Sequence, residues 1–167
     1  MPRQRSVPAR TAGAVVVLGL LAGTLAGCGS GTVEVHAPPA SGAVAARCAG
    51  LLKALPRAVA DQQRRAVSTG AHSYAAAWGD PPIVLRCGVP KPRGLNRFAT
   101  CQQVNGVGWF VPPQQIDRGP GPITMTSIGI QPRVQVQLPG DYWPPAAAMA
   151  DLAKSVKASL KHTHSCV

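Results

Sequence analysis

The spacing of the cysteines constrains the fold of this chain more than any other feature. The sequence contains five of them, Cys28, Cys48, Cys87, Cys101 and Cys166. Cys28 is assigned below to an export signal, so four remain for the domain that follows. Four cysteines in an oxidising compartment predict two disulfide bonds, although they allow three pairings. We favour Cys87–Cys101, which would pin the loop between them, and Cys48–Cys166, which would join the start of the domain to its end.

Disulfide bonds matter here because the chain can build only a modest hydrophobic core. Aromatic residues make up 4% of the sequence. Once a leader and a linker are set aside, roughly 120 residues remain, which is enough for one core but not two. In the chain-entropy model, a bond that closes a loop of about 15 residues contributes about 3 kcal/mol, and a longer loop contributes more.

The N-terminus has the features of a lipoprotein signal peptide. Its first ten residues carry three arginines, and residues 12–26 form an uncharged, mainly apolar run. This run is short for a membrane span and no stop-transfer charges follow it, so a cleaved signal is favoured. It ends in Leu25-Ala26-Gly27-Cys28, which looks like a lipobox. The sequence therefore predicts a signal peptide over residues 1–27 and a lipid-modified (palmitate-type) Cys28 on the extracytoplasmic face of the cell membrane.

After Cys28, residues 28–41 contain glycine, serine and proline and predict a flexible tether, leaving residues 42–167 as a single domain. Three of the 17 Lys and Arg lie in the leader, so the mature chain keeps 14 against six acidic residues, a net charge of +8. A basic domain outside the cell meets anionic headgroups and wall polymers first. We find no nucleic-acid motif.

The pattern of apolar residues predicts an α+β domain. One helix begins near Ser41 and ends at Pro56, and a weakly helical stretch containing Arg64 and Arg65 follows it. A second helix begins after Pro145, with apolar residues at helical spacing. Between the helices lie five strand-like segments, residues 73–78, 83–87, 104–111, 123–130 and 133–138. We expect two layers, an antiparallel sheet of about five strands with both helices on one face, stapled by the disulfides.

One block of the sequence is a candidate recognition surface. Between Trp78 and Gly88 the chain combines an aromatic residue, a carboxylate, two prolines and a guanidinium group. Trp78 would serve as an aromatic platform, with Asp80 and Arg86 as polar contacts for a wall glycan or a peptide. The alternative is a tight hairpin, in which Trp78 fills the core and Arg86 pairs with a carboxylate.

The C-terminus offers weak candidates for a metal site. His162, His164 and Cys166 alternate, and imidazole and thiolate ligands could hold zinc or copper. No second ligand cluster completes such a site, so we assign no metal and no cofactor. Catalysis on glycans needs a pair of carboxylates in a cleft, and nucleophilic catalysis needs a base beside Ser or Cys. The sequence shows no such motif and predicts no enzyme.

Several local motifs carry a resemblance to a known family. These are Cys48 with Leu51-Leu52 and Leu55-Pro56; Trp78-Gly79-Asp80-Pro81-Pro82-Ile83-Val84-Leu85-Arg86-Cys87-Gly88-Val89; Val104-Asn105-Gly106-Val107-Gly108-Trp109; and the closing helix with Cys166. Over about residues 44–167 the chain resembles a family of uncharacterised actinobacterial secreted or membrane-associated lipoproteins, described as a domain of unknown function. The resemblance implies an exported or lipid-anchored domain with paired cysteines and no assigned reaction, and it carries over no catalytic residue.

Taken together, these features predict an accessory or binding lipoprotein of the cell envelope. Besides the membrane itself, its partner would be an envelope protein or an anionic wall polymer. A small envelope hydrolase and a metal-handling lipoprotein that uses the C-terminal His/Cys tail are the alternatives.

Overall fold

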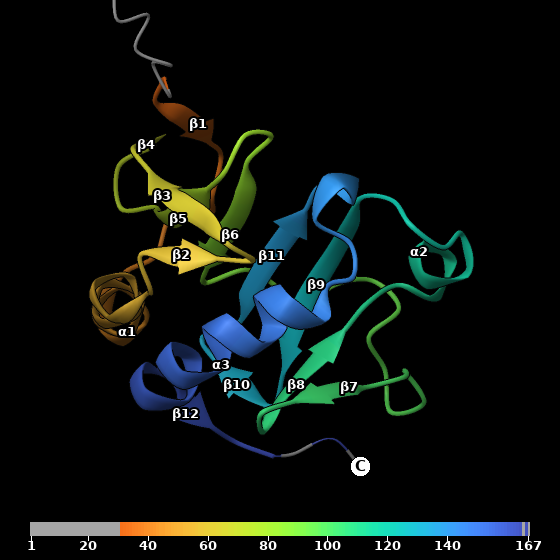
Figure 1. Ribbon diagram of the computed structural model, residues 1–167. Helices are drawn as coiled ribbons and strands as arrows, with labels where there is room; N and C mark the ends of the chain where they lie inside the picture. Colours follow the sequence, from red (N-terminus) through yellow and green to blue (C-terminus); the bar gives the residue numbers. More distant parts are fainter. Residues whose placement is uncertain (1–30, 165, 167) are drawn as a thin grey trace, which may run out of the picture.

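The computed structural model describes residues 31–164 and 166 and shows an α+β fold (Figure 1). Its main sheet has eight strands, all antiparallel to their neighbours, so the expected number of five was too low. In spatial order the strands are β2 (Ala58–Val59), β3 (Gln62–Arg65), β5 (Tyr74–Trp78), β6 (Ile83–Cys87), β11 (Val134–Leu138), β9 (Ile123–Ile128), β8 (Val107–Phe110) and β7 (Gln102–Val104).

The five expected strands correspond to the central strands β5, β6, β11, β9 and β8. The three additional strands, β2, β3 and β7, are short and lie at the two edges of the sheet. The stretch that contains Arg64 and Arg65 is therefore strand β3 rather than weak helix. Two small sheets complete the fold: β1 (Val33–Val35) pairs in parallel with β4 (Val67–Thr69), and β10 (Ile130–Gln131) pairs with β12 (Lys161–His162).

Two long helices, α1 (Gly42–Ala54) and α3 (Ala146–Ser159), pack on one face of the sheet and against each other. A short helix, α2 (Pro113–Asp117), and a 3-10 turn, η1 (Gly140–Tyr142), lie in connections. The hydroxyl of Ser155 on α3 donates a hydrogen bond to the carbonyl of Ala54, at the end of α1 (2.7 Å). This bond links α3 to the C-terminal end of α1 within the helix layer.

Alternation along the strands determines which side chains meet the helices. In β11, Val134, Val136 and Leu138 are buried, and the intervening Gln135 and Gln137 lie on the opposite face, as the period of two predicts. In β6, Ile83, Leu85 and Cys87 likewise join the core under the helices. A single apolar cluster thus fills the space between sheet and helices.

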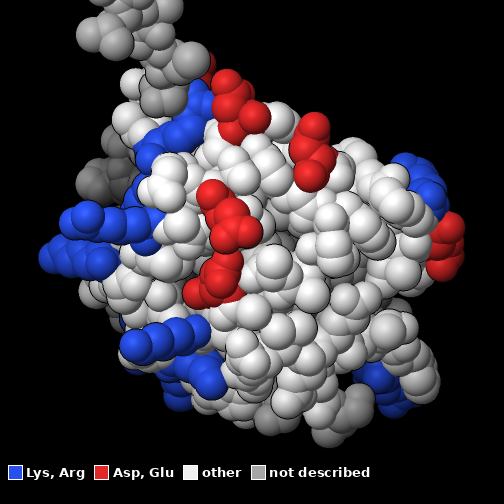
Figure 2. Space-filling model, in the orientation of Figure 1, with Lys and Arg blue, Asp and Glu red and all other residues white. Residues whose placement is uncertain are grey.

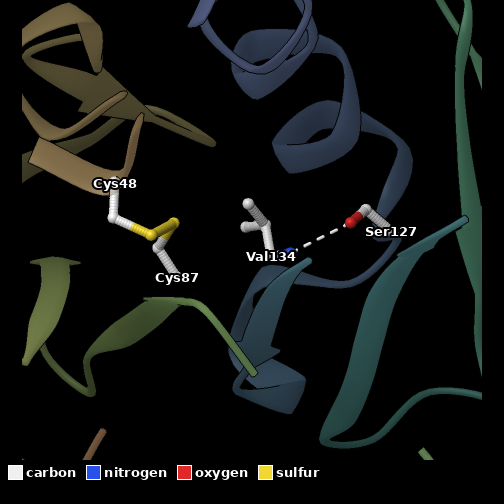
Figure 3. Close-up of a disulfide and its surroundings, with 4 residues drawn as sticks. All are labelled: Cys48, Cys87, Ser127 and Val134. Atoms are coloured by element: carbon white, nitrogen blue, oxygen red, sulfur yellow. Dashed lines mark hydrogen bonds between the residues drawn. A yellow bond between two sulfur atoms is a disulfide. The ribbon is translucent and has the colours of Figure 1, made fainter. Parts of the chain in front are cut away.

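The disulfide pairing differs from our expectation. Cys48 on α1 bonds to Cys87 at the end of β6, with Cα atoms 5.7 Å apart (Figure 3), and Cys101 bonds to Cys166, with Cα atoms 5.8 Å apart. The predicted pairs Cys87–Cys101 and Cys48–Cys166 were wrong. The reason is strand alternation, because Cys87 shares the face of Leu85 and points at the helix layer, where Cys48 is buried.

This pairing makes a prediction for variants that remove two cysteines at a time. Cys48→Ala/Cys87→Ala deletes one bond and should leave the free thiol count of the domain unchanged. Because the bond closes a long loop, the free energy of unfolding should fall by about 2–4 kcal/mol. Cys48→Ala/Cys166→Ala should instead break both bonds. Thiol alkylation followed by mass spectrometry, with urea unfolding, measures both effects. Two free thiols in Cys48→Ala/Cys87→Ala would contradict the observed pairing, because both other pairings leave two cysteines without a partner in that variant.

Part of the expected tether belongs to the folded domain. Val33 and Val35 in β1 face Ala75 and Val84 on the far side of the sheet, and Val35 is 2% exposed. The backbone N–H of Ala40 also donates a hydrogen bond to the carbonyl of His72. The folded part of the chain therefore starts before residue 42, because Val35 is buried, and Val33 partly buried, against the face of the sheet opposite the long helices. Cys28 lies outside the described residues, and no described helix has the length and apolar content to cross a membrane.

Candidate anion-binding pocket

The structure does not bring Trp78, Asp80 and Arg86 together as one recognition surface. Trp78 is fully buried under the helices, and its indole N–H donates to the carbonyl of Pro56 (3.1 Å). Asp80 is exposed in the β5–β6 turn, with one carboxylate oxygen 3.4 Å from a guanidinium nitrogen of Arg65. Arg86 alternates with Leu85 and so lies on the opposite face of the sheet. The block forms a hairpin whose tryptophan belongs to the core.

Arg86 has a structural environment of its own. Its Nε donates to the carbonyl of His36 (2.8 Å), and one terminal nitrogen donates to Oε1 of Gln137 (2.7 Å). Burial lowers the pKa of the Arg86 guanidinium from its ordinary value. Instead of pairing with a carboxylate, Arg86 holds the chain that follows β1 against the polar face of β11.

The two C-terminal histidines lie in different surroundings. His162 is exposed in β12 and pairs with Ile130 of β10, while His164 lies beside Gly129. Cys166 is bonded to Cys101, so it offers no thiolate. The described part of the chain contains no group of three or more His, Cys, Asp or Glu residues placed to hold one metal ion.

The carboxylates are all exposed and lie on different elements and loops. They are Glu34, Asp61, Asp80, Asp117, Asp141 and Asp151. Figure 2 shows acidic side chains at the top, centre and right margin of one face and basic side chains along its left and lower margins and at the upper right. In the lower third of this view, the described residues show basic groups and no acidic ones.

A pocket forms where three distant segments meet at one end of the sheet. The first is the loop 88–100, the second is the connection from β9 through β10 to β11, and the third is the C-terminal segment after β12. The N–H of Thr163 donates to the carbonyl of Gly129 (2.7 Å), and the Cys101–Cys166 bond holds the C-terminal segment beside β7. The pocket has a volume of about 260 Å³.

Glycines make the close approach of these segments possible. Gly129 has a φ of +65°, and a Cβ atom there would collide with the backbone of His164. At Gly108 in β8, a Cβ atom would lie 2.6 Å from Sγ of Cys166 and 2.9 Å from Sγ of Cys101. A side chain at either position would push the C-terminal segment away from the pocket.

The charged side chains that the described residues place around the pocket are all basic. Lys91 and Arg97 come from the loop and are exposed, and Arg133 precedes β11 and is half-buried. His164 and the amide of Asn96 also line it, and no Asp or Glu in the part of the chain that the structure describes does so. Within the described residues none of the three cations Lys91, Arg97 and Arg133 forms an ion pair. Uncompensated positive charges around a concave surface attract an anion.

We did not foresee this pocket from the sequence, because its cations come from segments far apart in the chain. One signal was available. Between Asp80 and Asp117 the sequence has no acidic residue but four basic ones, Arg86, Lys91, Arg93 and Arg97. Two of these four line the pocket.

The α+β fold and the two disulfide bonds define a disulfide-linked domain. Its C-terminal segment closes a basic pocket. The chain belongs to the family described as "Protein of unknown function (DUF3515)", whose model matches residues 9–164. No curated protein matches the chain. No solved structure matches it either.

Proposed function

We propose that this protein is a lipid-anchored binding protein of the cell envelope, and that its pocket holds an anionic group. The observation that carries the proposal is the set of three cations, Lys91, Arg97 and Arg133, around a pocket that no Asp or Glu of the described residues lines. The leader and the Leu25–Cys28 lipobox support export and anchoring. Two disulfide bonds suit a domain that works in an oxidising compartment.

Binding is favoured over catalysis by what lines the pocket. Acid/base chemistry needs a pair of groups that can exchange a proton, and a nucleophile needs a base beside it. The lining formed by residues 31–164 and 166 has no Asp or Glu, and its two cysteines are bonded to each other. The pocket can therefore neutralise and orient an anion, and this is the function we assign to it.

The test compares two variants that each remove three positive charges. Lys91→Gln/Arg97→Gln/Arg133→Gln should weaken the binding of inorganic phosphate and of short polyphosphate about tenfold at low salt. Each exposed charge contact is worth roughly 0.2–1 kcal/mol, and about 1.4 kcal/mol corresponds to tenfold. Isothermal titration calorimetry on the full chain in a neutral detergent gives the affinities.

The matched control is Lys154→Gln/Lys157→Gln/Lys161→Gln, which removes three exposed lysines from α3 and β12. It lowers the net charge equally but leaves the pocket intact, so it should retain most of the affinity. If both variants lose the same affinity, the binding comes from net charge alone and the proposed site is wrong.

A further inference from the structure

We infer that the pocket takes an acidic polysaccharide on the wall side of the membrane. A carboxylate or phosphate of the polymer would enter the pocket, while one of its sugar rings packs on Phe98. This inference rests on the proposed function and specifies the ligand class of the same site. Two observations carry it: the position of the pocket relative to the anchor, and an exposed aromatic ring at the pocket rim.

The anchor end of the domain is fixed by Arg65. One terminal nitrogen of its guanidinium donates to the carbonyl of Gly31 (2.7 Å), and the other donates to the carbonyl of Gly79 (2.9 Å). Gly79 lies in the turn between β5 and β6. Cys28 precedes Gly31 by three residues, so an extended chain places it within roughly 11 Å of Gly31. The lipid on Cys28 would therefore hold this end of the sheet near the bilayer.

The pocket lies at the other end of the same strands. Strand β6 runs from the turn after Gly79 to Cys87, and Cys87 is opposite Val134. The N–H of the next residue, Gly88, donates a hydrogen bond of 2.8 Å to the carbonyl of Arg133. Arg133 lines the pocket. Five strand residues span roughly 17 Å. In Figure 1 strand β1, which follows Gly31, lies at the top, and strand β12, which precedes the C-terminal part of the pocket, lies near the bottom.

This arrangement directs the pocket away from the membrane to which the chain is anchored. Headgroups of that membrane lie at the Gly31 end, so they are poor candidates for the ligand. Anionic polymers of the wall lie on the side that the pocket faces. Of the two anionic partners that a basic envelope domain meets, the geometry favours the wall polymer.

Phe98 adds the second part of the recognition surface. It is 81% exposed, and its neighbours Arg97 and Ala99 both line the pocket. The guanidinium carbon of Arg97 lies 4.8 Å from the centre of the phenyl ring. The N–H of Phe98 donates to Oδ1 of Asn96 (2.8 Å), which fixes the local turn. The ring is thus held beside the cations instead of in the core.

An aromatic face next to a cationic pocket matches the chemistry of an acidic sugar. The C–H face of a sugar ring packs on an aromatic ring, while its acidic group accepts charge-assisted hydrogen bonds from lysine and arginine. Inorganic phosphate offers only the second of these contacts. Phe98 should therefore distinguish an acidic oligosaccharide from a simple anion.

The binding test uses the full chain in neutral detergent, with a short oligogalacturonate and inorganic phosphate as probes. Phe98→Ala should weaken oligogalacturonate binding about fivefold and change phosphate binding less than about twofold. Val44→Ala removes the other large exposed hydrophobic side chain of the described residues and should change neither affinity. If phosphate binds but Phe98→Ala leaves the oligogalacturonate affinity unchanged, the inference is wrong and the proposed function stands. If neither probe binds, both are wrong.

The position of the pocket has a test of its own. An environment-sensitive fluorophore is attached to Phe98→Cys or to Thr32→Cys, and the lipidated protein is reconstituted into vesicles of brominated phosphatidylglycerol. We expect quenching of the label at position 32, near the anchor, and little at position 98. Quenching at position 98 equal to that at position 32 would place the pocket on the lipid and overturn the inference.

Discussion

Replacing Cys28 with serine is expected to abolish fatty acylation of this protein and to release it from lipid anchoring. The sulfur of Cys28 is the atom that would receive the diacylglyceryl group, and a serine hydroxyl cannot replace it in a lipobox. Each buried methylene contributes about 0.8 kcal/mol to membrane binding, so two or more acyl chains give a stable anchor. Metabolic labelling with an alkyne fatty acid, followed by gel analysis, measures the acylation directly.

The label is the decisive readout, because a leader that is not cleaved could itself hold the variant in the membrane fraction. The matched control is Cys101→Ser/Cys166→Ser, which removes two other cysteines and should keep the full label. Acylation of Cys28→Ser at the level of the unaltered chain would refute the anchor. The orientation of the pocket is inferred from the short stretch of chain between Cys28 and Gly31. That inference would then fail as well.

Much of the fold follows from the period of apolar residues, and the missing parts have a physical explanation. The central strands β5, β6, β9 and β11 are apolar enough to be recognised without tertiary information. Strand β3, in contrast, reads Gln-Gln-Arg-Arg and carries no such pattern. It forms because a hairpin turns at Ala60 and Asp61, where φ is +47° and +60°. Asp151 on α3 accepts a hydrogen bond from the N–H of Ala60 (2.8 Å), so a helix distant in sequence helps to hold this turn.

The disulfide pairing was partly accessible from the sequence. The expected number of bonds followed from an even cysteine count, but the pairing depends on which face each cysteine occupies. Cys87 lies on the same face of β6 as Ile83 and Leu85, and Cys48 lies on the buried side of α1 with Leu51. Those two periods indicate that both sulfurs point into one layer. The position of the C-terminal segment beside Cys101 has no comparable signal, because it depends on the short pairing of β12 with β10.

The candidate site was the least predictable part, because its charged residues share no local pattern. In the sequence, Arg133 is a polar residue just before a strand of alternating apolar residues. His164 is one of two histidines in a polar C-terminal segment. They meet Lys91 and Arg97 only after β9 and β11 pair and the Cys101–Cys166 bond fixes the C-terminal segment. The absence of acidic residues between Asp80 and Asp117 was the indication of the site that the sequence contained.

Replacing Trp78 with alanine is expected to lower the free energy of unfolding by about 3–5 kcal/mol, a large share of the total for a domain of this size. Trp78 is fully buried in a core with few aromatic side chains, and the guanidinium carbon of Arg64 lies 5.7 Å from the ring centre. Urea unfolding followed by circular dichroism measures the loss.

Phenylalanine variants separate packing from hydrogen bonding at this position. The indole N–H of Trp78 donates to Pro56, whereas the Nε1 of Trp109, also fully buried, has no hydrogen-bond partner among the described residues. Trp78→Phe should therefore cost about 1 kcal/mol more than Trp109→Phe, because only the first leaves a backbone carbonyl without its donor. Equal losses in the two phenylalanine variants would show that the bond to Pro56 contributes nothing, and that Trp78 stabilises the domain through packing alone.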